Sequence, residues 1–308
     1  ELWKRYSKIH LKGSTYLKYS NLIDKHIIPE LGDICISQIN SVLLADFMNH
    51  KLKHGRIDKN GGLAASYVKN IMIIVTEIIN FSIDEGYSSP IRIKLHMPKN
   101  EKGEIRVMDK INQKTLEDYL FSHLTPTNMG ILLSLNTGLR IGEICALKWS
   151  DIDFQKAILK VNSTVSRVKS DDENSSKSKL IIDTPKTQSS IREIPIISQL
   201  MKPLIFLYET RNSEYIISAE TSFVSPRTFE YRFHTVLEKC RISPFNYHVL
   251  RHTFATRCIE GGVDIKSLSE ILGHANVSVT LNTYVHSSIE RKRELLEKIS
   301  ENTTESHK

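Results

Sequence analysis

The side chains best able to do chemistry are a tyrosine near the carboxyl end of the sequence and the cations and histidines that precede it. In chain order, the candidates are Arg140, Lys186, His248, Arg251, His274 and Tyr284. A guanidinium donates paired, charge-assisted hydrogen bonds to phosphate oxygens and keeps its charge at physiological pH. A tyrosine hydroxyl, with an ordinary pKa of about 10, attacks when a base or a cationic surrounding assists it. The set therefore predicts phosphate transfer with tyrosine as nucleophile.

Three of these residues suit the phosphate itself. Arg140 and Arg251 would hold its two non-bridging oxygens and stabilise the charge of the transition state. His274 would donate a hydrogen bond to a phosphate oxygen.

The other three would attack or move protons. His248 would accept or relay the proton of Tyr284, and Lys186 would protonate the departing 5′ oxygen. His248 and His252 also have the i, i+4 spacing of a helical zinc pair. No glutamate follows the first histidine and no third ligand is evident, so we expect no metal and no other cofactor.

Short helices separated by glycine breaks must bring these residues together. We expect three helices. The first begins at His248 and ends at Gly261–Gly262, and the second is capped by Asp264 and ends at Gly273. The third is capped by Asn276 or Ser278 and carries Tyr284. His248 and Arg251 lie three apart and share one helix face. The breaks return Tyr284 toward that face and leave His274 in a turn.

The order and context of these motifs resemble the tyrosine recombinase (phage integrase) family. The matching segments are Thr137-Gly-Leu-Arg140-Ile-Gly-Glu143, Thr184-Pro-Lys186-Thr, His248-Val-Leu-Arg251-His252-Thr253, Leu272-Gly-His274 and Tyr284. The resemblance covers nearly the whole chain and is greatest to integrases of phages and conjugative transposons. It implies a site-specific recombinase that integrates and excises a mobile element through a 3′-phosphotyrosine, without ATP. Glu143 is expected to be a structural support.

The same resemblance implies the partners. They are double-stranded DNA attachment sites, with a dimer on one site and a homo-tetramer during strand exchange, and accessory excision or bending proteins. We expect a bacterial, cytoplasmic, nucleoid-associated protein. An arm-binding domain, frequent in such integrases, would lie before Glu1.

The expected fold is mainly α with a small β-sheet (α+β), in two domains that form a C-shaped clamp on DNA. The expected segments are a helical core-binding (SAM-like) domain over 1–97, a linker over 98–110, a catalytic domain over 111–286 and a tail helix over 287–308. The apolar stripe of the tail would dock on a neighbouring protomer in trans. Packing in cis on its own domain is the alternative.

Caps and apolar spacing place the individual elements. The expected helices are 15–28 (stopped by Pro29), 41–54 (capped by Ser41), 64–85, 112–123, 127–136, 141–147 and one opened by Ser225-Pro226. The expected strands are 157–168, 180–183 and 191–197, with a polar hairpin tip over 169–179.

Composition is consistent with a nucleic-acid partner. The 308 residues carry a net charge of +7, and residues 1–100 hold 14 Lys and Arg against 9 Asp and Glu. Such an excess favours a polyanion, with a solvated surface as the alternative. Four cysteines without metal-ligand spacing indicate reduced thiols. No run of 18 apolar residues and no secretory signal is present, so no membrane is expected.

Individual DNA contacts follow no distinctive pattern. The candidates are Lys12, Lys18, Lys51, Lys69, Arg227 and Thr228, each with plain solvated surface as the alternative. Two other functions stay open at this point. One is a type IB topoisomerase, which religates the same strand, and the other is a DNA-binding relative without catalysis.

Overall fold

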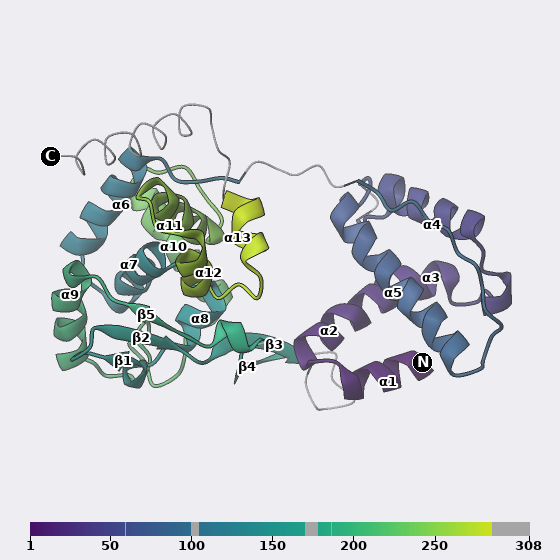
Figure 1. The fold of residues 1–308 in the computed structure, drawn as a ribbon, viewed down its shortest axis with the longest axis horizontal. Helices are drawn as coiled ribbons and strands as arrows, with labels where there is room; N and C mark the ends of the chain where they lie inside the picture. Colours follow the sequence, from purple (N-terminus) through teal and green to yellow (C-terminus); the bar gives the residue numbers. More distant parts are fainter. Residues whose placement is uncertain (59, 100–104, 170–177, 186, 285–308) are drawn as a thin grey trace, which may run out of the picture. The chain divides into compact units, whose positions relative to one another are not determined.

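The computed structural model describes residues 1–58, 60–99, 105–169, 178–185 and 187–284. The chain divides into two compact units, unit 1 (residues 1–104 with 167–181) and unit 2 (residues 105–166 with 182–308). Both are rich in helices, and the strands are few and short, which confirms the α+β expectation (Figure 1). The predicted domain boundaries at residues 97 and 110 stay predictions. The tail over 287–308 and most of the predicted hairpin tip lie outside the described residues.

Unit 1 is a helical bundle around one apolar helix. Its elements are α1 (Leu2–His10), α2 (Gly13–Leu22), the π-helix η1 (Ile23–Ile27), α3 (Ile28–Leu31), the 3₁₀ turn η2 (Ile36–Gln38), α4 (Ser41–His54) and α5 (Ala65–Asp84). The apolar spacing that predicted this helix is confirmed, because Val68, Ile71, Ile74, Val75 and Ile79 are at most 3% exposed and Ile78 is partly buried. In the described chain, α5 alone is long and apolar enough to cross a membrane, and its burial in this core accounts for that composition.

The first predicted helix begins within two residues of its prediction, but its cap and its end differ from the prediction. Lys12, rather than Ser14, occupies the N-cap position of α2, and the helical chain continues past Pro29 to Leu31. The π-helix η1 ends just before Pro29, so the proline lies in the first turn of α3, where its missing N–H needs no partner. The cap of α4 is also displaced by one residue, since Asn40 accepts hydrogen bonds from the first turn.

Unit 2 is organised around α7 (Pro126–Thr137), which is apolar on all sides and buried. Helix α7 contacts α6 (Lys110–Ser122), α8 (Ile141–Ala146), α9 (Ser198–Glu209), α10 (Pro226–Lys239) and α11 (His248–Glu260). The chain ends its described part with α12 (Ile265–Leu272) and α13 (Val277–Tyr284), which pack on each other and on α11. The predicted helices of this unit are confirmed to within two residues at each end, including the Ser225 cap of α10.

The long strand predicted over 157–168 is wrong. It is two strands in different sheets, β2 (Ile158–Val161) and β3 (Thr164–Lys169). Strand β2 pairs antiparallel with β1 (Ile152–Asp153) and with β5 (Arg192–Pro195), whereas β3 pairs with β4 (Ser178–Asp183). Asn162, between β2 and β3, donates a side-chain hydrogen bond to Asp151, in the 3₁₀ turn η3 (Trp149–Asp151), and this contact holds the chain where it changes partners.

Candidate active site

Arg251 lies at the centre of a group of functional residues in unit 2. Its side chain is buried, at 2% exposure, on the first turn of α11. Nη1 donates to the carbonyl of Gly138 and Nη2 to that of Leu272, each at 2.8 Å. These carbonyls end α7 and α12, and the negative ends of two helix dipoles therefore face one guanidinium. Burial, followed by the charge of Arg140, lowers the pKa of Arg251 to about 10, which leaves it charged at neutral pH.

Arg140 reaches the same place from the N-cap position of α8. Its backbone N–H donates to Oε2 of Glu143 at 2.9 Å, and its Nη1 donates to Oε1 at 2.7 Å. Its Nη2 donates to the carbonyl of Gly273 at 3.1 Å. The side chain keeps 36% exposure, so its guanidinium remains open to a ligand while its geometry is fixed.

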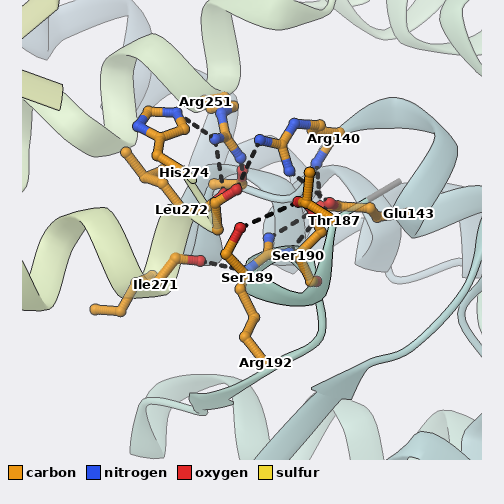
Figure 2. A network of polar contacts seen from close by, with 12 residues as sticks. Arg140, Glu143, Thr187, Ser189, Ser190, Arg192, Arg251, Ile271, Leu272 and His274 are labelled. Carbon is orange, nitrogen blue, oxygen red and sulfur yellow. Dashed lines mark hydrogen bonds and ion pairs between the residues drawn. The ribbon is translucent and has the colours of Figure 1, made fainter. Parts of the chain in front are cut away.

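Glu143 joins this guanidinium to a second, buried one (Figure 2). Arg192, from β5, donates through Nη1 and Nη2 to the two oxygens of Glu143, at 3.1 and 2.9 Å. Burial alone would raise the pKa of Glu143, but hydrogen bonds and charge from Arg192, together with Arg140, outweigh it and lower the pKa. The contacts agree with the expected supporting role of Glu143.

Arg192 was not identified from the sequence as a residue of the site. It also donates to the carbonyls of Ile271, at 2.5 Å, and Ser190, at 3.0 Å, and thus ties the end of α12 to the start of β5. One signal was available. Arg192 and the buried Ile194 are two apart on a strand and share the inward face, where an unpaired arginine is not expected.

His274 lies in the turn after Gly273, whose left-handed backbone (φ 65°) ends α12 as predicted. Its Nε2 lies 2.8 Å from Nη2 of Arg251. An arginine nitrogen only donates, so Nε2 accepts, and the ring proton is on Nδ1, 2.7 Å from the buried Thr280 hydroxyl. Burial and then the surrounding arginines lower the pKa of His274 to about 4. As the ring lies here, it does not present the N–H that the expected donation to phosphate needs.

Tyr284 ends α13 with its hydroxyl beside α11. The Oη atom lies 2.9 Å from Nδ1 of His252. Burial raises the pKa of Tyr284, opposed by the charge and hydrogen bonding of Arg251, so the phenol is protonated at neutral pH. Among the contacts described, the hydroxyl lies against His252 and not against His248, and the predicted role of His248 as proton acceptor stays a prediction.

His248 is exposed and packs edge-on against His252, with ring centroids 4.7 Å apart. Desolvation, followed by the positive surroundings, lowers the pKa of His248 to about 4. It is therefore a neutral imidazole at neutral pH, close to Arg251 and His252, and the described contacts include no hydrogen bond between it and Tyr284.

Lys186 lies outside the described residues, and its predicted role stays a prediction. The segment that follows it is tied to the site. The hydroxyl of Thr187 lies 3.0 Å from that of Ser189 and 2.8 Å from that of Ser190, and the Ser190 carbonyl accepts from Arg192 (Figure 2).

The DNA-binding candidates divide by exposure. Lys51 differs from the other candidates, because its side chain is 4% exposed and its Nζ lies 2.5 Å from Oε1 of Glu30. This ion pair competes with a phosphate for the ammonium group, and the contact of Lys51 with DNA stays a prediction. The other five side chains are exposed, namely Lys12, Lys18, Lys69, Arg227 and Thr228, and their contacts with DNA remain predictions.

Together, the site offers two guanidinium groups, neutral imidazoles and one phenol around one point. Such a set can bind a tetrahedral anion and attack it with a tyrosine oxygen.

Comparison with known proteins points to the same chemistry. Residues 104–291 match the model of the phage integrase family, and residues 1–52 match the N-terminal SAM-like domain of phage integrase. The chain is 30% identical, over 94% of its length and 78% of the relative's, to a tyrosine recombinase XerC-like protein of Caldanaerobacter subterraneus subsp. tengcongensis. It is 24% identical to the ICEBs1 integrase of Bacillus subtilis, over 96% of this chain and 79% of that one.

A solved structure gives the same result for the fold. The Tn1549 transposon integrase, in complex with transposon right end DNA, aligns with a TM-score of 0.78. The alignment covers 97% of this chain and 98% of that one, at 20% identity.

Proposed function

This chain belongs to the phage integrase family, and on that premise we propose that it is a tyrosine-type site-specific recombinase that integrates and excises a mobile DNA element. The observation that carries the proposal is the position of the Tyr284 hydroxyl, at hydrogen-bond distance from a neutral histidine and influenced by the charge of Arg251. The name of the ICEBs1 integrase supports a mobile element as the source.

The proposed reaction is a pair of ester exchanges at a DNA phosphate. Arg140 and Arg251 hold the non-bridging oxygens, and Tyr284 attacks phosphorus, which gives a 3′-phosphotyrosine and a free 5′ hydroxyl. The 5′ hydroxyl of a partner strand then attacks and releases Tyr284. Each step replaces one phosphate ester with another, so no external energy source enters. Lys186 is proposed to protonate the leaving 5′ oxygen.

Double-stranded DNA is the proposed partner. The excess of five basic residues in the first 100, with Lys18 and Lys69 exposed on α2 and α5, supports a unit that binds the phosphate backbone. Arg227, in the first turn of α10, would contact DNA from unit 2.

We propose that four subunits act together. Exchange between two duplexes requires four strand cleavages, and each chain carries one Tyr284. A dimer would occupy each site, with the tail over 287–308 contacting a neighbouring subunit. Accessory excision or bending proteins are part of the same proposal.

The four cysteines are free thiols, which supports a reducing bacterial cytoplasm as the compartment.

A strand-joining assay tests recombination against the two alternatives. Labelled duplexes that contain the DNA flanking the gene are incubated with the chain and with a longer, unlabelled second duplex. The proposal predicts labelled products of recombinant length that are absent with Tyr284→Phe. Relaxation of supercoiled plasmid without joined products would instead indicate a topoisomerase, and DNA binding without either would indicate an inactive relative.

A further inference from the structure

His252 is a polar neighbour of Tyr284, the nucleophile of the proposed reaction. No part in that reaction was assigned to His252 from the sequence. His252 lies one helical turn beyond His248 on α11, and its Nδ1 is 2.9 Å from Oη of Tyr284. The two rings lie with centroids 5.6 Å apart. This distance is within the reach that a general base requires before a substrate is bound.

The direction of this hydrogen bond follows from the charge of Arg251. That positive charge acts on the Tyr284 phenol and opposes the rise in its pKa. A cation on one side favours turning the oxygen lone pairs toward it, and the single phenol proton then points to His252. Nδ1 is therefore the acceptor, and the ring proton of His252 is on Nε2.

On the basis of the proposed function, we infer that His252 is a catalytic residue whose Nδ1 accepts the proton of Tyr284 as the phenol oxygen attacks phosphorus. It takes the role that sequence reasoning gave to His248.

The electrostatic surroundings of His252 suit a base that is protonated only briefly during the reaction. The charged and titratable groups that face His252 within the described residues are Arg251 and His248, from α11, and Tyr284, from α13. Burial and the charge of Arg251 lower the pKa of His252, so its ring is free of the extra proton at neutral pH. Transfer from a resting phenol is unfavourable, and it becomes favourable as Oη bonds to phosphorus and loses electron density.

The step balances without any added reagent. The Oη–H bond of Tyr284 breaks and its proton goes to Nδ1 of His252, while the Oη–P bond forms and the bond from phosphorus to the 5′ oxygen breaks. The 5′ oxygen takes a proton from its own donor, proposed to be Lys186, and leaves as a hydroxyl. In the rejoining step, Oη is the leaving group and recovers its proton from His252.

Covalent-complex formation on a nicked duplex tests this role. After cleavage, the short fragment with the free 5′ hydroxyl dissociates at the nick, and the adduct is trapped because the strand is not rejoined. The rate is followed on denaturing gels from pH 5 to pH 9 for the wild-type chain, His252→Asn and His252→Ala. Asparagine keeps an acceptor near the Nδ1 position but is not a base. His123→Asn is the matched control, since His123 is exposed at the end of α6 and away from the site. DNA affinity and thermal melting of each variant check binding and folding.

We expect both His252 variants to form adduct ~10²-fold or more slowly than the wild-type chain, with unchanged DNA affinity. Difluorotyrosine at position 284, whose phenol is more acidic, should abolish most of this difference. As the pH rises, the wild-type rate should level off above the pKa of His252. The rates of the variants should instead keep rising until the pH reaches the pKa of the Tyr284 phenol.

A wild-type rate in His252→Asn would overturn the inference, because it would show that an acceptor suffices and a base is not needed. A defect that difluorotyrosine leaves unchanged would overturn it as well. Both outcomes leave the proposed function intact. The absence of any adduct with the wild-type chain would remove the proposed function and this inference with it.

Discussion

Arg192 and Glu143 form a bidentate ion pair in which neither side chain is more than 6% exposed. The hydrogen bonds and ion pairs described for this pair do not include Tyr284. It holds one carboxylate against the Arg140 backbone and guanidinium, and it holds the end of α12, two residues before His274, through the Ile271 carbonyl. The position of two predicted catalytic residues therefore depends on one buried contact.

Removing Glu143 should be costly for folding. Glu143→Ala leaves Arg192 buried without its counter-ion, which is expected to lower the free energy of unfolding by about 3–5 kcal/mol. Urea titration of the wild-type and variant chains measures this difference. Glu193→Ala is the control, because the neighbouring Glu193 pairs with Lys160 at the surface and should cost about 0–1 kcal/mol. Equal losses in the two variants would contradict the structural role given to Glu143.

Gly138 should tolerate no side chain. Its φ is 67°, and an added Cβ would lie 2.7 Å from Cδ1 of Phe254 and 2.8 Å from Cδ2 of Leu272. Gly262 offers a matched comparison, with φ 83° and nothing within 4 Å of an added Cβ. Gly262→Ala should cost about 1–2 kcal/mol from backbone strain alone, and Gly138→Ala about 1–3 kcal/mol more from overpacking.

Gly138→Ala should also slow adduct formation, because the Gly138 carbonyl orients Arg251. Chemical denaturation and the nicked-duplex assay measure the two effects. Similar stabilities of the two alanine variants would mean that the space around Gly138 is less filled than described.

These contacts show what the sequence could and could not predict. The helices that carry the site were found because Ser225, Asp264 and the glycines at 138 and 273 are caps that act locally. The burial of Lys51 and of Arg192 was not predicted, because it depends on partners 21 and 49 residues away, Glu30 and Glu143.

The choice between His248 and His252 was beyond local reasoning for a geometric reason. The two histidines are four apart on α11 and lie on one face, so spacing alone does not distinguish them. The packing of α13 on α11 decides which ring meets the Tyr284 hydroxyl.

Acidification should destabilise unit 2 before its carboxylates protonate. The pKa values of His248 and His274 are about 4 in the folded chain, against an ordinary value of about 6.5. The unfolded chain therefore binds more protons between these values, so stability is unaffected above pH 6.5 and falls as the pH drops toward 4.

Thermal unfolding from pH 7 to pH 5 measures this loss. His274→Asn should flatten the dependence on pH. A wild-type melting temperature that stays constant over this range would contradict the neutral, half-buried state of His274.

The exposed lysines of unit 1 should differ from Lys51 in their effect on DNA binding. Lys18→Ala and Lys69→Ala should each reduce the slope of log affinity against log salt by about 1, as expected for a lost phosphate contact. Lys51→Met should leave the slope unchanged and lower stability, because it removes one of the two partners of Glu30, the other being His50. Fluorescence anisotropy with labelled duplex over a salt series gives the slopes. A reduced slope for Lys51→Met alone would reverse the assignment.

The central claim, that Tyr284 attacks a DNA phosphate, is tested most directly by mapping the covalent adduct. The wild-type chain is incubated with a library of nicked duplexes drawn from DNA flanking the gene, and covalent complexes are digested and sequenced by mass spectrometry. We predict a nucleotide attached through its 3′ phosphate to Tyr284, and no complex with Tyr284→Phe. An adduct on another residue, or an undiminished adduct in Tyr284→Phe, would contradict the account.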